Sequence, residues 1–270
     1  MNLSICSFAS SSSGNSYLVR SEETAILVDA GLTAKATDAA LAQLGLGCAD
    51  LGAICVTHEH TDHIKCLHTL VKRRPFENAV FASEGTMNSI LEKTSAISQD
   101  DFEVVGAGDT FTVGDIKVTV FALSHDAAEP TGYAFERNGK KIAIVTDTGC
   151  MTEEIYEIIS GADALVIEAN HEVNLLLYGR YPYPLKRRIM GDEGHLSNEA
   201  CAEALCRYLR EIDGEKVPSV VLAHLSSENN TPAQAYLTVK NILEENDFLV
   251  GRDLLMNTAP KSELGEIIEV

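Results

Sequence analysis

The hydrophobic positions of the chain fall into short runs separated by polar or amphipathic stretches. Ten runs of four to seven residues predict buried β-strands, at residues 2–8, 17–20, 25–28, 53–57, 79–82, 117–123, 132–136, 141–146, 164–167 and 219–223. Longer stretches with apolar residues at helical spacing predict helices at 33–44, 62–73, 83–93, 152–160, 197–211 and 232–245. Strands interleaved with helices in this way predict an α/β fold whose sheets are covered by helices.

A charged or imidazole side chain stands at the end of six of these hydrophobic runs. These residues are Asp29, His58, His125, Asp147, Glu168 and His224. In layered α/β folds, ligands bind at the carboxyl ends of the strands, so we expect the six side chains to meet in one cleft. The alternative is that polar residues follow strands because turns favour them, which explains Asp29 alone well but not three histidines and three acids placed alike.

The segment His58-Glu59-His60-Thr61-Asp62-His63 is the strongest chemical signal in the chain, because five of its six residues carry metal-donor groups. On an extended strand end, His58 and His60 point the same way and Glu59 points the other way. Asp62 and His63 come where a helix should begin, so they can face a second ion. The alternative is a solvated, histidine-rich loop.

We therefore expect a pair of divalent ions, zinc or manganese with iron also possible, held by imidazoles and carboxylates. One ion is assigned to His58, His60 and His125, the other to Asp62, His63 and His224, and Asp147 can bridge both. Such a pair can activate a hydroxide for hydrolysis. Gly149, two residues after Asp147, is expected to allow the tight turn that the bridge needs. For each ligand outside 58–63, the alternative is a hydrogen-bonded residue at a strand end.

Composition narrows the protein class. With 270 residues, 45% of them hydrophobic, the chain can form a sizeable core, and we expect a single domain over residues 1–270. We expect no membrane span, because no stretch approaches ~20 apolar residues, and no signal peptide. Seven cysteines without a Cys-x-x-Cys pair argue against a disulfide framework, so we expect the reducing cytoplasm.

The net charge of −19 works against nucleic-acid binding by bulk electrostatics, although bound divalent cations would invert the field locally. One basic cluster stands out, and in it Lys186 and Arg187 could contact a nucleic-acid backbone. In the serine-rich segment 10–16, Ser13 and Asn15 could help present backbone N–H groups to a phosphate. The alternatives are a solvated basic patch and an ordinary serine-rich turn.

The motifs in this order resemble the metallo-β-lactamase superfamily. The resemblance rests on 58–63, Ser124-His125, Thr146-Asp147-Thr148-Gly149 and Ala223-His224-Leu225. It implies a four-layer αββα sandwich with a dinuclear metal site at the edge of two sheets, and it implies that Asp29 orients the metal-binding loop from behind the ligands.

Further motifs are similar to those of YycJ/WalJ-type proteins within this superfamily. They are 11–16, His125-Asp126-Ala127, Glu168-Ala169-Asn170-His171, Tyr181-Pro182 and 194–198. This resemblance implies a metal-dependent 5′-to-3′ exonuclease acting on double-stranded DNA. The expected substrate is therefore a nucleic acid, and the oligomeric state is left open.

A likeness to tRNA-processing relatives implies a catalytic pair of Glu168 and His195. In that pair His195 protonates the leaving oxygen, and Glu168 fixes the tautomer of the imidazole and raises its pKa. We also count Asp62 among the catalytic candidates. The alternative is that His195 only packs at a helix start, while Glu168 pairs with a surface lysine. His171 could contact the edge of the site or be an ordinary loop residue.

Other functions remain open at this point. The same metal-activated hydroxide could hydrolyse a small ester, thioester or lactam, which would need neither the Glu168–His195 pair nor a basic patch. A non-catalytic signalling partner is disfavoured because a structural metal site needs only four ligands. A redox di-iron role is disfavoured because iron-using relatives replace the second histidine of the motif with an acid, whereas His60 is intact.

Overall fold

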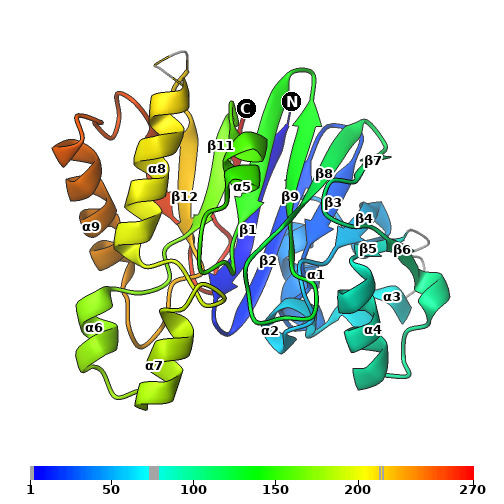
Figure 1. Ribbon diagram of the computed structural model, residues 1–270. Helices are drawn as coiled ribbons and strands as arrows, with labels where there is room; N and C mark the ends of the chain where they lie inside the picture. Colours follow the sequence, from blue (N-terminus) through cyan, green and yellow to red (C-terminus); the bar gives the residue numbers. More distant parts are fainter. Residues whose placement is uncertain (1–2, 73–78, 213, 215) are drawn as a thin grey trace. The chain divides into compact units, whose positions relative to one another are not determined.

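The computed structural model describes residues 3–72, 79–212, 214 and 216–270 (Figure 1). The chain forms two compact units. Unit 1 comprises Met1–Ala122, Ala127–Lys140 and Pro260–Val270, and unit 2 comprises Leu123–Asp126 and Lys141–Ala259. The single-domain organisation over residues 1–270 stays a prediction.

Unit 1 contains a mixed sheet in the order β14-β1-β2-β3-β4-β5-β6. Its strands are β1 (Ser4–Ser11), β2 (Gly14–Arg20), β3 (Ala25–Val28), β4 (Leu51–Cys55), β5 (Val80–Ala82), β6 (Phe102–Val104) and β14 (Ile268–Glu269). The pairs from β14 to β3 are antiparallel, and the pairs from β3 to β6 are parallel. The carboxyl ends of β3 and β4 therefore lie at the same edge of the sheet.

Three further strands of unit 1 pair antiparallel, namely β7 (Thr110–Val113), β8 (Ile116–Ala122) and β9 (Thr131–Arg137). They pack on one face of the first sheet. The hydroxyl of Tyr133 donates to the carbonyl of Val56 at 2.8 Å, and the rings of Phe81 and Phe111 stack with centroids 4.0 Å apart. Tyr133 is fully buried, and aromatic contacts of this kind between two sheets stabilise their packing.

The opposite face of the first sheet is covered by helices. They are α1 (Ala34–Gln43), α2 (Thr61–Ile64), α3 (Leu67–Lys72) and α4 (Glu84–Lys93), with single 3₁₀ turns at Cys48–Asp50 and Gln99–Asp101. Leu41, Leu70 and Ile90 from these helices join a continuous apolar core with the sheet. The side chains of Thr33 and Ser83 accept backbone N–H groups and so begin α1 and α4.

The helix predicted at 62–73 is two short helices, and its last residue lies outside the described residues. The break comes at the backbone of Ala30. The N–H of Ala30 donates to the carbonyl of His63 at 2.7 Å, and the carbonyl of Ala30 accepts the N–H of Cys66 at 2.9 Å. These tertiary bonds use groups that a continuous helix would bond within itself, so α2 ends and α3 begins afresh.

Unit 2 contains four parallel strands, β10 (Lys140–Val145), β11 (Ala164–Glu168), β12 (Ser219–Ala223) and β13 (Leu255–Thr258), in sequence order. Helices α5 (Glu153–Ile159), α8 (Asn198–Ile212) and α9 (Pro232–Glu245) accompany them, and α8 lies beside α9 (Figure 1). The fully buried Tyr208 on α8 donates to the carbonyl of Ala162 at 2.6 Å. The hydroxyl of Ser197 accepts the N–H of Ala200, so Ser197 caps the start of α8.

Two short helices, α6 (Val173–Tyr178) and α7 (Tyr183–Ile189), complete unit 2 and were not predicted. All ten predicted strands are present, with residue 2 outside the described residues, whereas β6, β7, β13 and β14 were missed. The strands form two seven-stranded sheets, the second in the order β13-β12-β11-β10-β9-β8-β7. Both are mixed and flanked by helices, in agreement with the predicted fold class. Within the described residues, no helix is long and apolar enough to span a membrane, and no disulfide joins the seven cysteines.

Candidate functional site

In unit 1, the donor residues follow β4 directly. Nε2 of His58 and Nδ1 of His60 are 2.9 Å apart. Two nitrogens bound to one tetrahedral zinc ion are separated by about 3.3 Å, so a small adjustment would let both bind the same ion. Glu59 points elsewhere, as predicted, because its Oε1 accepts the N–H of Ala128 at 2.9 Å.

His63 is held from behind by the carboxylate of Asp29. Nδ1 of His63 lies 2.7 Å from Oδ2 of Asp29, and the N–H and hydroxyl of Thr57 also donate to that carboxylate, at 2.8 to 3.1 Å. Asp29 adopts a positive φ of 61°, a conformation that is rare for residues other than glycine and that clusters at functional sites. With Nδ1 bound to Asp29, Nε2 of His63 is the nitrogen that can coordinate a metal.

The serine-rich turn lies against the same donors. Asn15 is fully buried, and its side-chain nitrogen lies 3.0 Å from Nε2 of His63 and 3.4 Å from Oδ2 of Asp62. Asn15 also bonds both backbone groups of Ser11 and thereby closes the β1–β2 hairpin. Its contacts favour a role in positioning the donors rather than a substrate contact. Ser13 is exposed, but its backbone N–H already donates to the hydroxyl of Ser11.

In unit 2, three candidate residues follow adjacent parallel strands. Asp147 comes after β10, Glu168 ends β11 and His224 comes after β12, so the topology brings them to one edge of the sheet. Ligand atoms of these residues and of His195 all lie within 4.8 Å of one another. Asp147 and His224 have positive φ values of 61° and 53°, like Asp29 in unit 1.

Glu168 is a fully buried carboxylate at the centre of this cluster. Its Oε1 lies 2.8 Å from Nδ1 of both His195 and His224, and its Oε2 accepts the N–H of Thr148 at 3.0 Å. Burial alone raises the pKa of Glu168, but the imidazoles of His195 and His224 outweigh it and hold the pKa well below its ordinary value. Burial lowers the pKa of His195, and the Glu168 carboxylate more than reverses this, so the pKa is raised.

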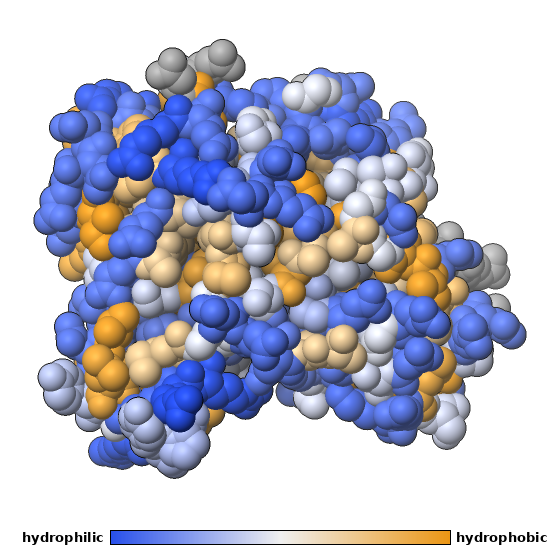
Figure 2. Space-filling model, in the orientation of Figure 1, coloured by the Kyte–Doolittle hydropathy of each residue, from blue (hydrophilic) through white to orange (hydrophobic). Residues whose placement is uncertain are grey.

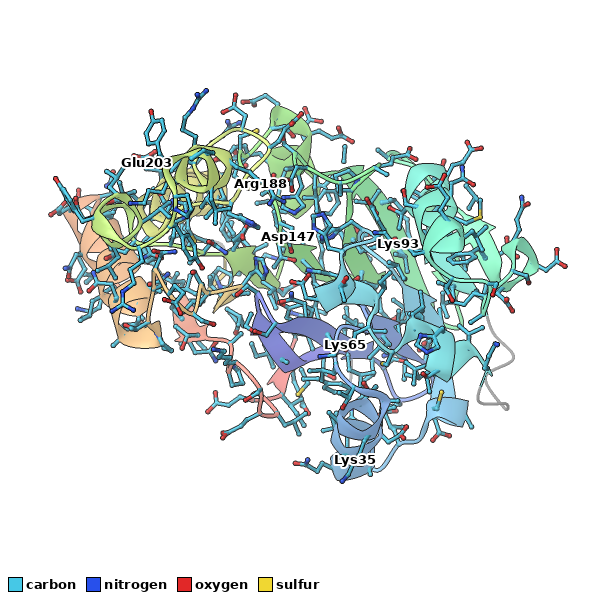
Figure 3. The ribbon with its side chains drawn as sticks, turned by 90° about the horizontal axis from the view of Figure 1, so that it is seen from below. Lys35, Lys65, Lys93, Asp147, Arg188 and Glu203 are labelled. Carbon is cyan, nitrogen blue, oxygen red and sulfur yellow. The ribbon has the colours of Figure 1, made fainter. Side chains whose placement is uncertain are left out.

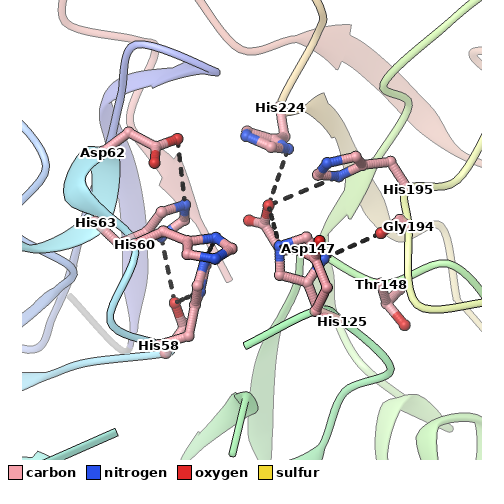
Figure 4. A network of polar contacts seen from close by, with 12 residues as sticks. His58, His60, Asp62, His63, His125, Asp147, Thr148, Gly194, His195 and His224 are labelled. Atoms are coloured by element: carbon pink, nitrogen blue, oxygen red, sulfur yellow. Dashed lines mark hydrogen bonds and ion pairs between the residues drawn. The ribbon is translucent and has the colours of Figure 1, made fainter. Parts of the chain in front are cut away.

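His125 approaches Asp147 from a separate loop of unit 2. Its Nδ1 lies 3.1 Å from the carbonyl of Gly194, and its Nε2 lies 3.8 Å from Oδ1 of Asp147 (Figure 4). The next residue, Asp126, forms an ion pair with Arg188 on α7. Arg188 can be found near Asp147 in Figure 3, in keeping with this series of contacts.

Gly149 is needed for a reason other than the predicted one. The turn at this motif is made by Asp147, which has the positive φ, whereas Gly149 does not. A Cβ atom on Gly149 would lie 2.3 Å from the carbonyl oxygens of Gly191 and Asp192. Glycine is therefore required because the loop that leads to His195 packs against its backbone.

The histidines share one arrangement that fits metal binding. In four of them, Nδ1 contacts an oxygen of another residue: His58 contacts Thr57, His63 contacts Asp29, His125 contacts Gly194, and His224 contacts Glu168. Such contacts fix the ring and select Nε2 as the metal donor. Together with the carboxylates of Asp62 and Asp147, these imidazoles suit zinc, manganese or iron. The residues present in each unit therefore fit a divalent metal.

Lys186 and Arg187, the two predicted phosphate contacts on α7, differ in their present partners. The ammonium of Lys186 donates to the carbonyls of Leu177 at 2.7 Å and Gly179 at 2.8 Å, which joins α7 to the end of α6. Arg187 is exposed and forms no ion pair with the residues that the structure describes. His171 is buried, and its Nδ1 has no hydrogen-bond partner among the described residues. Burial lowers the pKa of His171 to about 4.

Sequence reasoning missed the residues that hold the donors in place. Thr57 contacts Asp29, His58 and His63, and the side-chain amide of Asn170 donates to the carbonyl of His224 at 2.9 Å. The place of Thr57 directly before the histidine motif was the only available signal. Asn170 was part of the 168–171 motif, but its contact with His224 could not be predicted because the two residues are 54 positions apart.

Comparison with known proteins identifies the family. Residues 24–224 match the family described as "Beta-lactamase superfamily domain". The chain is 42% identical to a protein of Bacillus anthracis named "Exodeoxyribonuclease YycJ", over 97% of each chain. It is 39% identical to a protein of Streptococcus pneumoniae named "Exodeoxyribonuclease WalJ", over 93% of each chain.

Solved structures agree with this assignment at the level of the fold. The metallo-β-lactamase fold protein YhfI from Bacillus subtilis aligns over 99% of both chains with a TM-score of 0.70 and 14% identity. Zinc-bound PqqB from Methylobacterium extorquens aligns over 99% of this chain and 100% of its own, with a TM-score of 0.71 and 16% identity. The predicted fold class is confirmed, and the chain belongs to the metallo-β-lactamase superfamily and, within it, to the YycJ/WalJ-type group.

Proposed function

We propose that this protein is a metal-dependent exonuclease that degrades double-stranded DNA from the 5′ end. One observation carries the proposal, namely the contact between His195 and Glu168 beside Asp147 and His224. A histidine held by a buried carboxylate next to metal donors suits a reaction in which an oxygen must be protonated as it leaves. The relatives named exodeoxyribonucleases support DNA as the substrate.

The proposed ligands are those predicted from the sequence. His58, His60, Asp62 and His63 of unit 1 and His125, Asp147 and His224 of unit 2 would hold two divalent ions. When bound, the ions would lower the pKa of a water molecule and neutralise the charge that develops on the phosphate. The donor chemistry of both units and the zinc-bound PqqB neighbour support a divalent metal.

His195 is the proposed proton donor. Its side chain is 20% exposed, whereas that of His224 is 3% exposed, so a substrate can reach His195 more easily. Since Nδ1 of His195 is bound to Glu168, Nε2 would carry the proton to the leaving oxygen. Glu168 would keep this tautomer and favour the protonated ring, which agrees with the raised pKa of His195.

The remaining parts of the proposal concern substrate contacts and location. Arg187 would contact a phosphate, and a third ammonium hydrogen of Lys186 could do the same beside its two carbonyl partners. Ser13 stays a candidate substrate contact because it is exposed next to Asn15. A chromosomal DNA substrate would place the protein in the cytoplasm.

Duplex DNA labelled at either the 5′ or the 3′ end tests this function. Metal-loaded protein should release labelled mononucleotides early only from the 5′-labelled duplex, and chelation of the metal should stop release. No nucleotide release with manganese, magnesium or zinc would contradict the proposal. Hydrolysis of a thioester or lactam by the same preparation would then favour the alternative of a small-molecule hydrolase.

A further inference from the structure

Residues 173–190 form a helical hairpin, α6–α7, whose composition differs from that of the rest of the chain. This segment holds four of the 21 basic residues and none of the 40 acidic residues. It also holds three of the eight tyrosines. In a chain of net charge −19, such a segment is a local surface that can attract a polyanion.

Both ends of the hairpin are fixed next to the Glu168–His195 pair. On the entry side, His171 forms a parallel β-bridge with Ser197, and its carbonyl accepts the N–H of Asn198 at 2.9 Å. On the exit side, the N–H of His195 donates to the carbonyl of Ile189 at 2.9 Å. The last turn of α7 therefore contacts the backbone of the proposed proton donor directly.

The hairpin holds its shape without burying its aromatic residues. Leu176 is fully buried, and Lys186 joins the ends of the two helices through the carbonyls of Leu177 and Gly179. By contrast, the side chains of Tyr178 and Tyr183 are 87% and 71% exposed. Figure 2 shows hydrophobic and strongly hydrophilic residues side by side over these helices.

The exposed aromatic and basic residues lie close to one another on α7. Tyr183 and Arg187 are four positions apart, so they lie on the same face of the helix. Arg180 is exposed in the turn between the two helices, near Tyr178 in sequence. Tyrosine rings that stack on bases, next to arginines that pair with phosphates, are the combination that binds the unpaired end of a nucleic-acid strand.

We propose that the α6–α7 hairpin is the arm that holds the DNA end, with Tyr178 and Tyr183 stacking on terminal bases and Arg180 and Arg187 contacting phosphates. This inference rests on the proposed nuclease function and adds residues to it. The arm follows Glu168 closely in the sequence, and its last turn bonds the backbone of His195. A strand end held by the arm would therefore lie next to the proton donor. A duplex end that frays on the arm would supply single nucleotides to the site.

Fluorescence of 2-aminopurine tests the stacking directly, without hydrolysis. The fluorophore is placed at the 5′ end of a duplex and mixed with protein in excess chelator. Wild-type protein should quench the fluorescence. Tyr178→Ala and Tyr183→Ala should each weaken binding of the duplex end about 10-fold, whereas Tyr178→Phe, which keeps an aromatic ring, should bind like the wild type. Leu255→Ala, which removes a side chain of 54% exposure from β13 in the same unit, is the control and should bind like the wild type.

Activity measurements complete the test. With metal, both alanine variants should lose at least about 10-fold more kcat/KM on duplex DNA than on bis(p-nitrophenyl) phosphate, which has no bases to stack. Equal quenching by wild type and both alanine variants would overturn the inference. The inference would also be overturned if these variants still bound DNA but differed from the wild type in oligomeric state. The hairpin would then be a subunit interface.

The two proposals fail in different ways. If the wild-type protein degrades DNA but the tyrosine variants bind the duplex end equally well, the arm is wrong and the nuclease function stands. If the wild type quenches 2-aminopurine and the variants do not, but no metal supports degradation, the arm stands as a DNA-binding surface and the proposed reaction is wrong.

Discussion

Oε1 of Glu168 lies 2.8 Å from Nδ1 of His195. The same oxygen lies 2.8 Å from Nδ1 of His224, so one buried carboxylate contacts both the proposed proton donor and a proposed metal ligand. A substitution at Glu168 should therefore disturb two functions, whereas a substitution at His195 should disturb one.

Replacement of His195 by alanine should reduce turnover on DNA about 100-fold or more, because the leaving oxygen loses its proton donor. The metal content should not change, since His195 is not a proposed ligand. Steady-state kinetics and elemental analysis of the same preparation measure both quantities. His68→Ala, which removes an exposed histidine from α3, is the matched control, and unaltered turnover in His195→Ala would exclude the proposed role.

Glu168→Gln should lower both turnover and metal affinity. In the wild type, one carboxylate oxygen of Glu168 contacts His195 and His224, and the other accepts the N–H of Thr148. A glutamine has only one oxygen that accepts hydrogen bonds, so it cannot keep both sets of contacts. The orientation of His224 should suffer, with a loss of metal affinity of about 10- to 100-fold. Competition with a metal-binding dye measures the affinity. A variant with wild-type affinity and reduced turnover would limit Glu168 to supporting His195.

Asp29→Asn should weaken metal binding about 10- to 100-fold, because the amide removes the charge that orients His63 through Nδ1. Asparagine tolerates the positive φ of 61° at this position, so the backbone should keep its conformation. The same dye competition measures the effect. Asp100→Asn changes an exposed carboxylate in the same unit and should bind metal normally, and equal affinities of the two variants would refute the role of Asp29.

Removal of the metal should lower the melting temperature. A ligand present at 100 times its Kd stabilises the folded state by about 2.7 kcal/mol. For a chain of this size, that corresponds to a shift of about 5–10 °C. Scanning calorimetry with and without a chelator measures the shift, and readdition of zinc or manganese should reverse it. An equal melting temperature with and without the chelator would argue against metal binding by the folded protein.

Much of the site could be predicted because strand topology determines it. Asp147, Glu168 and His224 each follow a hydrophobic run, and adjacent parallel strands bring the residues after such runs to one edge. Residues 58–60 come after β4, and residues 61–63 lie in α2, as residue types and spacing predicted.

The parts that could not be predicted depend on tertiary contacts. The break between α2 and α3 comes from the bonds of Ala30, which lies 33 positions before His63 in the sequence. The pattern at Leu175, Leu176 and Leu177 fits no single helical face, because only Leu176 is buried, so α6 gave no amphipathic signal. The contact of Asn15 with His63 joins residues 48 positions apart.

Titration of metal into metal-free protein, with nucleotide release from 5′-phosphorylated duplex DNA followed at each point, tests the central claim most directly. The two-metal account predicts no release without metal, a maximum near about two equivalents per chain, and loss of release in both His58→Ala and His224→Ala. Release in the absence of metal, or full release by either variant, would contradict it.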